Sequence, residues 1–369
     1  MAIYNNAHLN GIPWEILIKE YRKHLNDNSF STLAEYRKDF FGWLSSHNYF
    51  QENRGEQYIL NDLLVFVQTV INNLNRQNVS KKELKAKFLN YLKNYIEKEI
   101  PRHKILDSLD GLDERKTKAF ISSLVAKTKT VIKRDLGIDF TDSAFSELLT
   151  NAYYEFLIHD QFAQFSGIIF FGYGHKELFP RLLPVYVSVV IDNKIRMVDD
   201  NAKEVMISDS LNACIQPFAQ TDVVDTILQG ISPELKSVST QTFQKFVRGF
   251  ISDIKSMDST PEGLKQQINH LNLVEIKQKY NEFIENIIKE KYVVPLMSTV
   301  AQLSKEDLAE MAESLVHLTY LKRRFTMAEE SVGGPVDVAI ITKGDGFIWI
   351  KRKHYFDPKL NQHFFKNLS

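Results

Sequence analysis

The sequence predicts a layered α/β fold in which a β-sheet is accompanied by two large sets of helices. Residues 31–153 show one amphipathic helical stripe after another. Residues 168–174 and 182–191 instead form β-branched and aromatic runs that are too short or too stiff for helices. A final helical stripe at 308–321 leads into two short apolar runs, which is the pattern of a helix followed by a closing hairpin.

The first predicted helix lies close to the start of the chain. Ile12-Pro13-Trp14 opens it, because proline is tolerated in a first helical turn. Its apolar face holds Trp14, Leu17, Ile18 and Tyr21. Later stripes with the same spacing are Leu63, Phe66, Val67, Val70, Ile71 and Leu74; Leu84, Phe88, Leu92, Tyr95 and Ile96; and Phe145, Leu148, Leu149, Ala152, Phe156 and Leu157. Ser80 with Glu83, and Asp142 with Ser143, are the cap candidates before the last two.

The predicted strands follow in the middle of the chain. Asp192-Asn193 supplies a turn after the run at 182–191, and residues 194–207 add one or two further strands. We expect another strand at 213–218, after which helical spacing resumes at 223–228 and stops at Gly230. This part of the sequence therefore predicts a sheet with a helix on it.

A second helical stretch is predicted at 242–290. Thr260-Pro261-Glu262 marks the start of its long helix, since it combines a cap with proline at the first helical position. The stripe of that helix is Leu264, Ile268, Leu271, Ile276, Tyr280, Phe283, Ile284, Ile287 and Ile288. In the closing hairpin, residues 336–342 and 347–350 are separated by Lys343-Gly344-Asp345-Gly346, with glycines where positive φ is needed.

Composition limits the function classes. The 369 residues include 46 Lys and Arg and 46 Asp and Glu, so no overall field attracts nucleic acid or an anionic membrane. The single cysteine, Cys214, forms no internal disulfide, which favours a reducing compartment. No signal-peptide pattern and no apolar run of about 18 residues is present. We expect a cytoplasmic protein without a membrane span, without a cofactor and without a metal site.

The order of these elements resembles that of proteasome-type subunits of the N-terminal-nucleophile (Ntn) hydrolase family. The correspondence runs from the helix at 12–24, through the helix at 143–159 and the strands that follow it, to the last helix and hairpin. Stretches 171–180 and 344–356 also resemble uncharacterised bacterial proteins of this type. The resemblance implies a sandwich core formed by 1–29, 141–232 and 293–369, with helical insertions at 30–140 and 233–292.

The resemblance implies the scaffold without its catalytic set. Family chemistry uses an amino-terminal threonine, serine or cysteine on a first strand, whose own amine serves as base. This chain begins about where those strands would already have ended, so the core is predicted to be incomplete at its N-terminus. Family members place an acid three residues before serine-glycine-glycine. Here Glu329 keeps the acid, but Val332 occupies the serine's place, and Ser331 fits only if the register slips.

Three hypotheses follow for function. The leading one is a non-catalytic assembly or interaction protein that self-associates, as the family's subunits do, or binds a protein partner. The second is an Ntn-type amidohydrolase or peptidase whose first strands are missing from this chain, with Glu329 and Ser331 as weak family-derived candidates. The third is nucleic-acid binding through Lys351, Arg352, Lys353 and His354, where basic and aromatic residues lie together and could contact phosphate and stack bases.

Other motifs have simpler structural explanations. Gly172-Tyr173-Gly174 lacks the third glycine of a dinucleotide loop and fits a tight turn at a strand end. Glu155 and His159 have the i, i+4 spacing of metal ligands but no third ligand nearby. Cys214 lies in an apolar run without a neighbouring base, as buried free cysteines commonly do.

Overall fold

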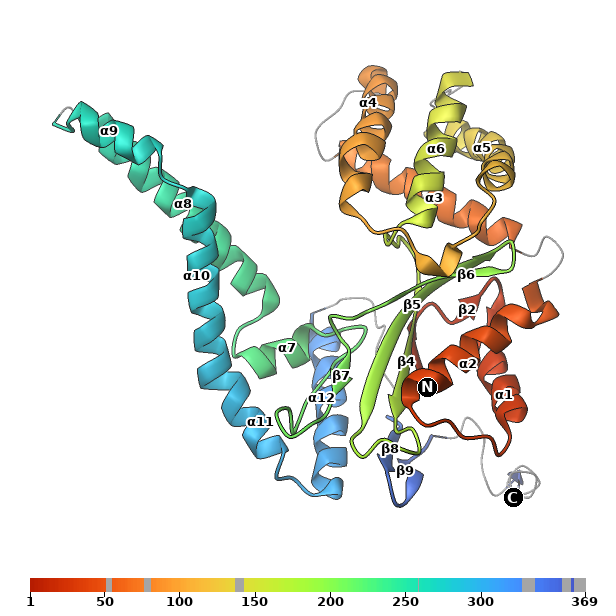
Figure 1. Ribbon diagram of the computed structural model, residues 1–369. Coiled ribbons are helices and arrows are strands. Elements are labelled where there is room, and N and C mark those ends of the chain that lie inside the picture. The colour runs from red at the N-terminus through yellow and green to blue at the C-terminus, as the bar shows by residue number, and fades with distance from the viewer. Residues whose placement is uncertain are drawn as a thin grey trace. The chain divides into compact units, whose positions relative to one another are not determined.

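The structure is a computed structural model, and it describes residues 1–50, 55–75, 81–136, 143–257, 259–326, 336–353 and 360–361. The chain divides into two compact units, Met1–Met206 and Ile207–Ser369. Both helices and strands are present, and every described strand pairing is antiparallel (Figure 1). The predicted mixed architecture of helices and sheet is therefore confirmed.

Unit 1 is built on a five-stranded antiparallel sheet. Its strands are β1 (Ala2–Asn5), β4 (Ser166–Gly172), β5 (Arg181–Ile191) and β6 (Lys194–Asp199), in the order β1-β4-β5-β6. The short β7 (Val205–Met206) pairs with the Arg181 end of β5. β5 and β6 are joined by Asp192-Asn193, where both residues have positive φ, as a two-residue hairpin turn requires. Two short strands, β2 (His8–Leu9) and β3 (Ile12–Pro13), pair separately.

Two helices contribute the core on one face of this sheet. They are α1 (Trp14–Leu25) and α2 (Leu33–Ser46), and α2 contacts β4, β5 and β6. Thr32 starts α2 with a capping box, because its side chain accepts from the Glu35 N–H while Glu35 reaches back. The buried set shared by helices and sheet includes Trp14, Leu17, Phe40, Leu44, Ile168, Phe170, Val185 and Val187.

A second hydrophobic core lies among the remaining helices of unit 1. These are α3 (Glu56–Asn75), α4 (Lys81–Asn94), α5 (Glu114–Leu136) and α6 (Ser143–Ile158), with short turns η1 (Asn48–Phe50), η2 (Tyr95–Glu99), η3 (Ile100–Arg102) and η4 (Asp107–Leu109). Their apolar stripes coincide with those predicted at 63–74, 84–96 and 145–157. Val189 and Ile191 of β5 join this core. Ser80 and Asp142, two of the predicted cap residues, lie outside the described residues.

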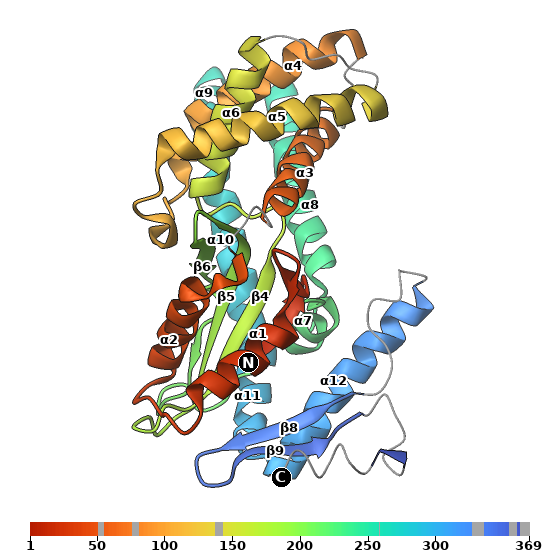
Figure 2. The same cartoon turned by 90° about the vertical axis from the view of Figure 1, so that its right-hand side faces the viewer.

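Unit 2 consists mostly of helices with one β-hairpin. In order these are α7 (Asp222–Gln229), α8 (Pro233–Ser256), α9 (Glu262–Asn269), α10 (Leu273–Ile288), η5 (Lys289–Val293), α11 (Val294–Val300), α12 (Lys305–Phe325), β8 (Val338–Thr342) and β9 (Gly346–Lys351). The predicted closing hairpin is confirmed as β8–β9, which lies along α12 (Figure 2). α8 and α10 run antiparallel to each other and form an arm with α9 near its tip (Figure 1).

Two predictions about unit 2 are wrong. Residues 213–218 form no strand, because no described strand pairs with them and an unpaired strand is not stable alone. The long helix predicted from Thr260-Pro261-Glu262 is interrupted at residues 270–272. α9 ends at Asn269, and the Asn272 side chain accepts from the N–H groups of Val274 and Glu275. Asn272 is thus the N-cap of a separate helix, α10.

The predicted division into a discontinuous core and two insertions stays a prediction. Within the range 30–140, α2 packs with α1 on the sheet, whereas α3 to α5 pack with α6. Within the range 233–292 lie α8, α9 and α10, which form the arm of unit 2. The boundary between the two compact units falls at residue 206, inside the range 141–232.

Candidate functional site

The most deeply buried charge in unit 1 is a structural arginine. Arg196 of β6 is 0% exposed, and its guanidinium stacks over Phe162 with 4.1 Å from Cζ to the ring centre. It donates to the backbone oxygens of Leu157 (2.5 Å), Phe156 (2.8 Å), His159 (3.1 Å) and Gln161, and to Ser188 Oγ (3.1 Å). Because α6 ends at Ile158, the Phe156 and Leu157 carbonyls are among those that a helix terminus leaves without helical partners, and His159 and Gln161 follow directly after that end. Arg196 thus caps α6 and ties it to the sheet.

A buried carboxylate lies near this arginine. Asp62 of α3 is 2% exposed, and its Oδ2 accepts from Tyr153 Oη at 2.9 Å while Oδ1 has no hydrogen-bond partner. Burial raises the pKa of Asp62, and the charge of Arg196 opposes that rise. Tyr153 is fully buried, and its pKa is raised by burial and by Asp62. The Tyr153 hydroxyl also lies 3.3 Å from the backbone oxygen of Ile59, a residue that lines the cavity described next.

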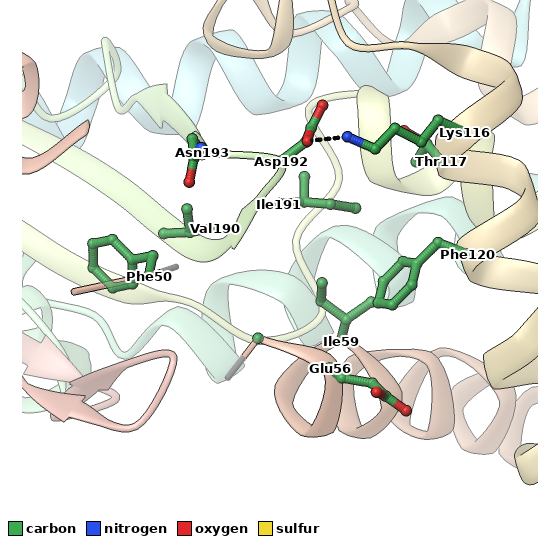
Figure 3. A pocket seen from close by; sticks show the side chains of 11 residues that line it. Phe50, Glu56, Ile59, Lys116, Thr117, Phe120, Val190, Ile191, Asp192 and Asn193 are labelled. Carbon is green, nitrogen blue, oxygen red and sulfur yellow. Dashed lines mark hydrogen bonds and ion pairs between the residues drawn. The ribbon is translucent and has the colours of Figure 1, made fainter. Parts of the chain in front are cut away.

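One cavity of unit 1, of about 390 Å³, lies where α3, α5 and the β5–β6 turn meet. Phe50 and Phe120 lie on opposite sides of it, and Ile59 of α3 lies beside Phe120 (Figure 3). Lys116 forms an ion pair with Asp192 across its lining, with 2.6 Å between Nζ and Oδ1. The remaining lining includes Gly55, Glu56, Thr117, Val190, Ile191 and Asn193.

This cavity is lined by polar and apolar side chains in similar proportion. The apolar ones are Phe50, Ile59, Phe120, Val190 and Ile191, and the polar ones are Glu56, Lys116, Thr117, Asp192 and Asn193. Its charged groups are already engaged, because Lys116 binds Asp192 and Glu56 binds Lys127. No histidine, serine or cysteine is among its described lining residues.

The structure describes only part of the predicted site residues. Glu329, Ser331 and His354 lie outside the described residues. Lys351 Nζ lies 2.5 Å from the Glu313 carboxylate, and Arg352 lies over the Trp349 ring at 5.3 Å. The backbone N–H of Lys353 donates to Asp337 at 2.6 Å. The structure thus places an acidic residue beside the basic side chain at 351 and an aromatic ring beside the one at 352.

The other sequence motifs have structural roles. The Glu155 backbone oxygen lies 2.7 Å from His159 Nδ1, and among the described residues no group of metal-ligating side chains is present. Gly174 packs so closely that an added Cβ would lie 2.2 Å from the Ser31 carbonyl oxygen. Cys214 is exposed and lies in no strand, so the prediction of a buried strand cysteine is wrong.

The arm of unit 2 carries a set of exposed apolar side chains. None of the 24 residues of α8 is buried, although α8 contains a regular apolar stripe. Phe246 is 71% exposed, Phe250 is 59% exposed and Phe283 of α10 is 63% exposed. Solvent-exposed single apolar residues are ordinary, whereas a contiguous set of large ones marks an interaction surface.

The seam between α8 and α10 uses a different set of residues. The Phe243 ring stacks on Tyr280 at 4.0 Å, Thr240 bonds Asn281 at 3.0 Å, and Ser239 bonds Tyr280 at 2.8 Å. Each residue of a helix is rotated by 100° about the helix axis from the previous one. On α8 the apolar stripe is rotated by about 90° from the seam residues, toward lower angles. On α10 Phe283 and Ile287 are rotated by about 80° from the seam residues in the same sense. Because the helices are antiparallel, equal rotations in the same sense point to the same side of the arm.

We define the apolar face of the arm by these exposed residues: Leu235, Val238, Phe246, Phe250, Phe283 and Ile287. Val274 apart, the opposite side carries polar residues: Ser237, Gln241, Gln244, Arg248 and Gln278. Part of this stripe, from Leu264 to Ile288, was predicted as the apolar face of a helix in the second insertion and not as a site. The spacing was visible, but spacing alone does not distinguish a stripe that faces a core from one that faces solvent.

Within the described residues, no helix has the length and apolar character that crossing a membrane requires. Comparisons with protein-family models, with curated proteins and with solved structures gave no match to this chain.

Proposed function

We propose that this chain is a non-catalytic assembly or interaction protein that binds a protein partner through the apolar face of its arm. The observation that carries this proposal is the exposure of six large apolar side chains on one side of α8 and α10. Burying apolar surface contributes about 25 cal/mol per Å², so an uncovered face of this kind favours association.

The chemistry of the arm fits a protein partner better than a nucleic acid. Residues 233–288 contain seven Lys and Arg and seven Asp and Glu, so the arm has no net charge to attract phosphate. Aromatic anchors at the centre of a surface with charges around it are typical of protein interfaces. Helical faces of this kind bind other helices through apolar positions at helical spacing.

The proposal includes the Ntn-type scaffold and a cytoplasmic location. What supports the scaffold is the order of elements: α1 after a short strand, α6 before β4, the β5–β6 hairpin, then α7 and finally α12 with β8–β9. What supports the location is the single cysteine, Cys214. In this proposal the scaffold positions the arm and performs no hydrolysis.

Site-specific photo-cross-linking in the cells that make the protein tests the proposal. A benzophenone amino acid replaces Phe246 in the apolar face, and the matched control places it at Gln241 on the polar side of the same helix. We expect a covalent adduct with a polypeptide from position 246 and little or none from 241. Equal yields from the two positions, or no polypeptide adduct at 246, would contradict the proposal.

A further inference from the structure

We infer that the partner of the arm is a second copy of this chain, and that two arms pack face to face as an antiparallel four-helix bundle. This inference rests on the proposed function, because it names the occupant of the apolar face. Four observations support it: the register of the arm, the size of its side chains, its charges and its area.

The register of α8 on α10 is fixed by polar contacts along the seam. Thr240 bonds Asn281, and Lys236 forms an ion pair with Glu285 at 3.6 Å. Both pairs have the same sum of residue numbers, so Val238 lies level with Phe283. By the same rule, Leu235 lies level with residues 286–287, and Phe246 lies level with residues 275–276. Each of these levels of α8 therefore has an apolar residue of α10 beside it.

Two copies related by a twofold axis parallel to the arm bring complementary residues together. In such a dimer α8 of one copy faces α10 of the other copy, and the two helices are antiparallel and at the same height along the axis. Val238 then meets Phe283, Leu235 meets Ile287, and Phe246 meets Ile276. Two of these contacts join a larger side chain to a smaller one, which is how facing layers of a helix bundle interdigitate. All neighbouring helices in the bundle are antiparallel, as in common four-helix bundles.

Gly249 supports a close approach at the outer end of the face. It lies between Phe246 and Phe250 on the same side of α8, and an added Cβ would meet nothing within 4 Å. Glycine in an exposed helix interior destabilises the helix relative to alanine, and no contact within 4 Å of an added Cβ requires it here. An approaching helix would use the space that Gly249 leaves open.

Charges at the rim of the face match across the same axis. Lys245 lies on the outer edge of α8, and Glu275 and Lys279 lie on the outer edge of α10, where they bind each other at 2.8 Å. The twofold axis brings the two edges together, so Lys245 of one copy lies level with Glu275 of the other. The balanced charge of the arm also means that two copies do not repel each other.

The area lies at the lower end of the range for specific interfaces. The 24 residues of α8 are about 36 Å long, the 16 residues of α10 are about 24 Å long, and each helix is about 10 Å wide. The face thus covers roughly 600 Å² per copy, or about 1,200 Å² for the pair, which is the lower limit of standard-size interfaces. The three phenylalanines at 246, 250 and 283 supply the aromatic anchors.

Sedimentation velocity of the full chain over a concentration series tests the dimer. We expect the wild type to be dimeric, and Phe246→Lys and Phe283→Lys each to raise the dissociation constant at least 30-fold, which is about 2 kcal/mol. The matched control, Gln241→Lys, adds the same charge to the polar side and should leave the constant within about twofold of the wild-type value. A monomeric wild type, or equal effects of Phe246→Lys and Gln241→Lys, would overturn the inference.

Two further experiments test the arrangement. Lys245→Glu should weaken the dimer, and Glu275→Lys in the same chain should restore it. In a mixture of ¹⁴N- and ¹⁵N-labelled chains, an amine cross-linker should join Lys245 to Lys279 in peptides of mixed isotope. No rescue together with cross-links only within one isotope would overturn this arrangement.

The failure of this inference can be distinguished from failure of the proposed function. If the wild type is monomeric and position 246 photo-cross-links to a different protein, the second copy is refuted while the interaction role stands. If the wild type is monomeric and position 246 yields no polypeptide adduct, both are refuted. Binding of the monomer to vesicles of neutral phospholipid, lost in Phe246→Lys, would assign the face to a membrane surface and also refute both.

Discussion

Replacing Arg196 with methionine should be among the most destabilising single changes in unit 1. Methionine keeps most of the apolar stem but removes a guanidinium that makes five hydrogen bonds. Two of those bonds satisfy the Phe156 and Leu157 oxygens in the last turn of α6, and two satisfy the His159 and Gln161 oxygens just after it. A buried acceptor left without a partner costs about 1–3 kcal/mol. Part of this cost is offset, because the variant no longer desolvates a charge.

The net loss can be bounded. Four abandoned carbonyls would cost roughly 4–12 kcal/mol if none found another partner, but water or a shifted backbone can satisfy some of them. Removing one partner of a buried charged network typically costs about 3–5 kcal/mol, and we expect a value in that range. Arg196→Lys should lose less, because it keeps a charge near Asp62 while losing the fork that reaches several carbonyls.

Urea unfolding followed by tryptophan fluorescence measures this loss in unit 1 alone. The chain has three tryptophans, and Trp14 and Trp43 lie in the core of unit 1. A Trp349→Phe background removes the signal of unit 2 from every variant. Arg181→Met is the matched control, because Arg181 is partly exposed and its pair with Glu204 at 2.7 Å lies near the surface. A loss below about 1 kcal/mol for Arg196→Met, or one no larger than that of Arg181→Met, would refute the reasoning.

Three further predictions follow from named contacts. Asp62→Asn should stabilise unit 1 relative to wild type, and the difference should grow as the pH rises from 4 to 7. Burial raises the folded-state pKa of Asp62 above its ordinary 3.8, so the contribution of Asp62 to stability is favourable at low pH and is lost as the pH rises through the folded-state pKa. A pH-independent difference in urea midpoint would contradict this. Gly174→Ala should cost about 1–3 kcal/mol, because the new Cβ would overlap the backbone at Ser31, whereas Gly42→Ala, which meets nothing within 4 Å, should be neutral or stabilising in the same thermal melts. If the basic patch binds single-stranded nucleic acid, Glu313→Gln should tighten binding of a fluorescent oligonucleotide at low salt, because it releases Lys351 from its ion pair, and unchanged affinity would count against that use of Lys351.

The sequence predicted well those elements whose signal is local. The apolar stripe predicted at 145–157 lies in α6, and β5 and β6 meet at the expected Asp192-Asn193 turn. These features depend on turn residues and periodicity within one segment. β1 was not predicted as a strand, because four residues that pair with β4 about 165 positions later carry little local signal.

Burial was predicted less well, and this limited the prediction of the site. The stripe from Leu264 to Ile288 has the spacing of a core helix, yet only Ile288 of α10 is buried. Periodicity shows which residues share a face and does not show what covers that face. Arg196 is the opposite case, because a charged residue in a strand suggests solvent exposure, while its actual environment depends on α6, about 40 residues earlier.

The side chains of the two units therefore differ in how they are covered. Unit 1 buries even the guanidinium of Arg196, and groups of the same chain accept its hydrogen bonds. The arm of unit 2 is held together by a narrow seam around Phe243 and Tyr280 and leaves Phe246, Phe250 and Phe283 exposed to solvent. A helix pair with so little internal burial gains much of its stability from whatever covers its outer face. If a second copy covers it, binding and folding of the arm are linked by mass action. The protection of arm amides from hydrogen exchange should then rise with protein concentration, while that of β4 and β5 in unit 1 should not change.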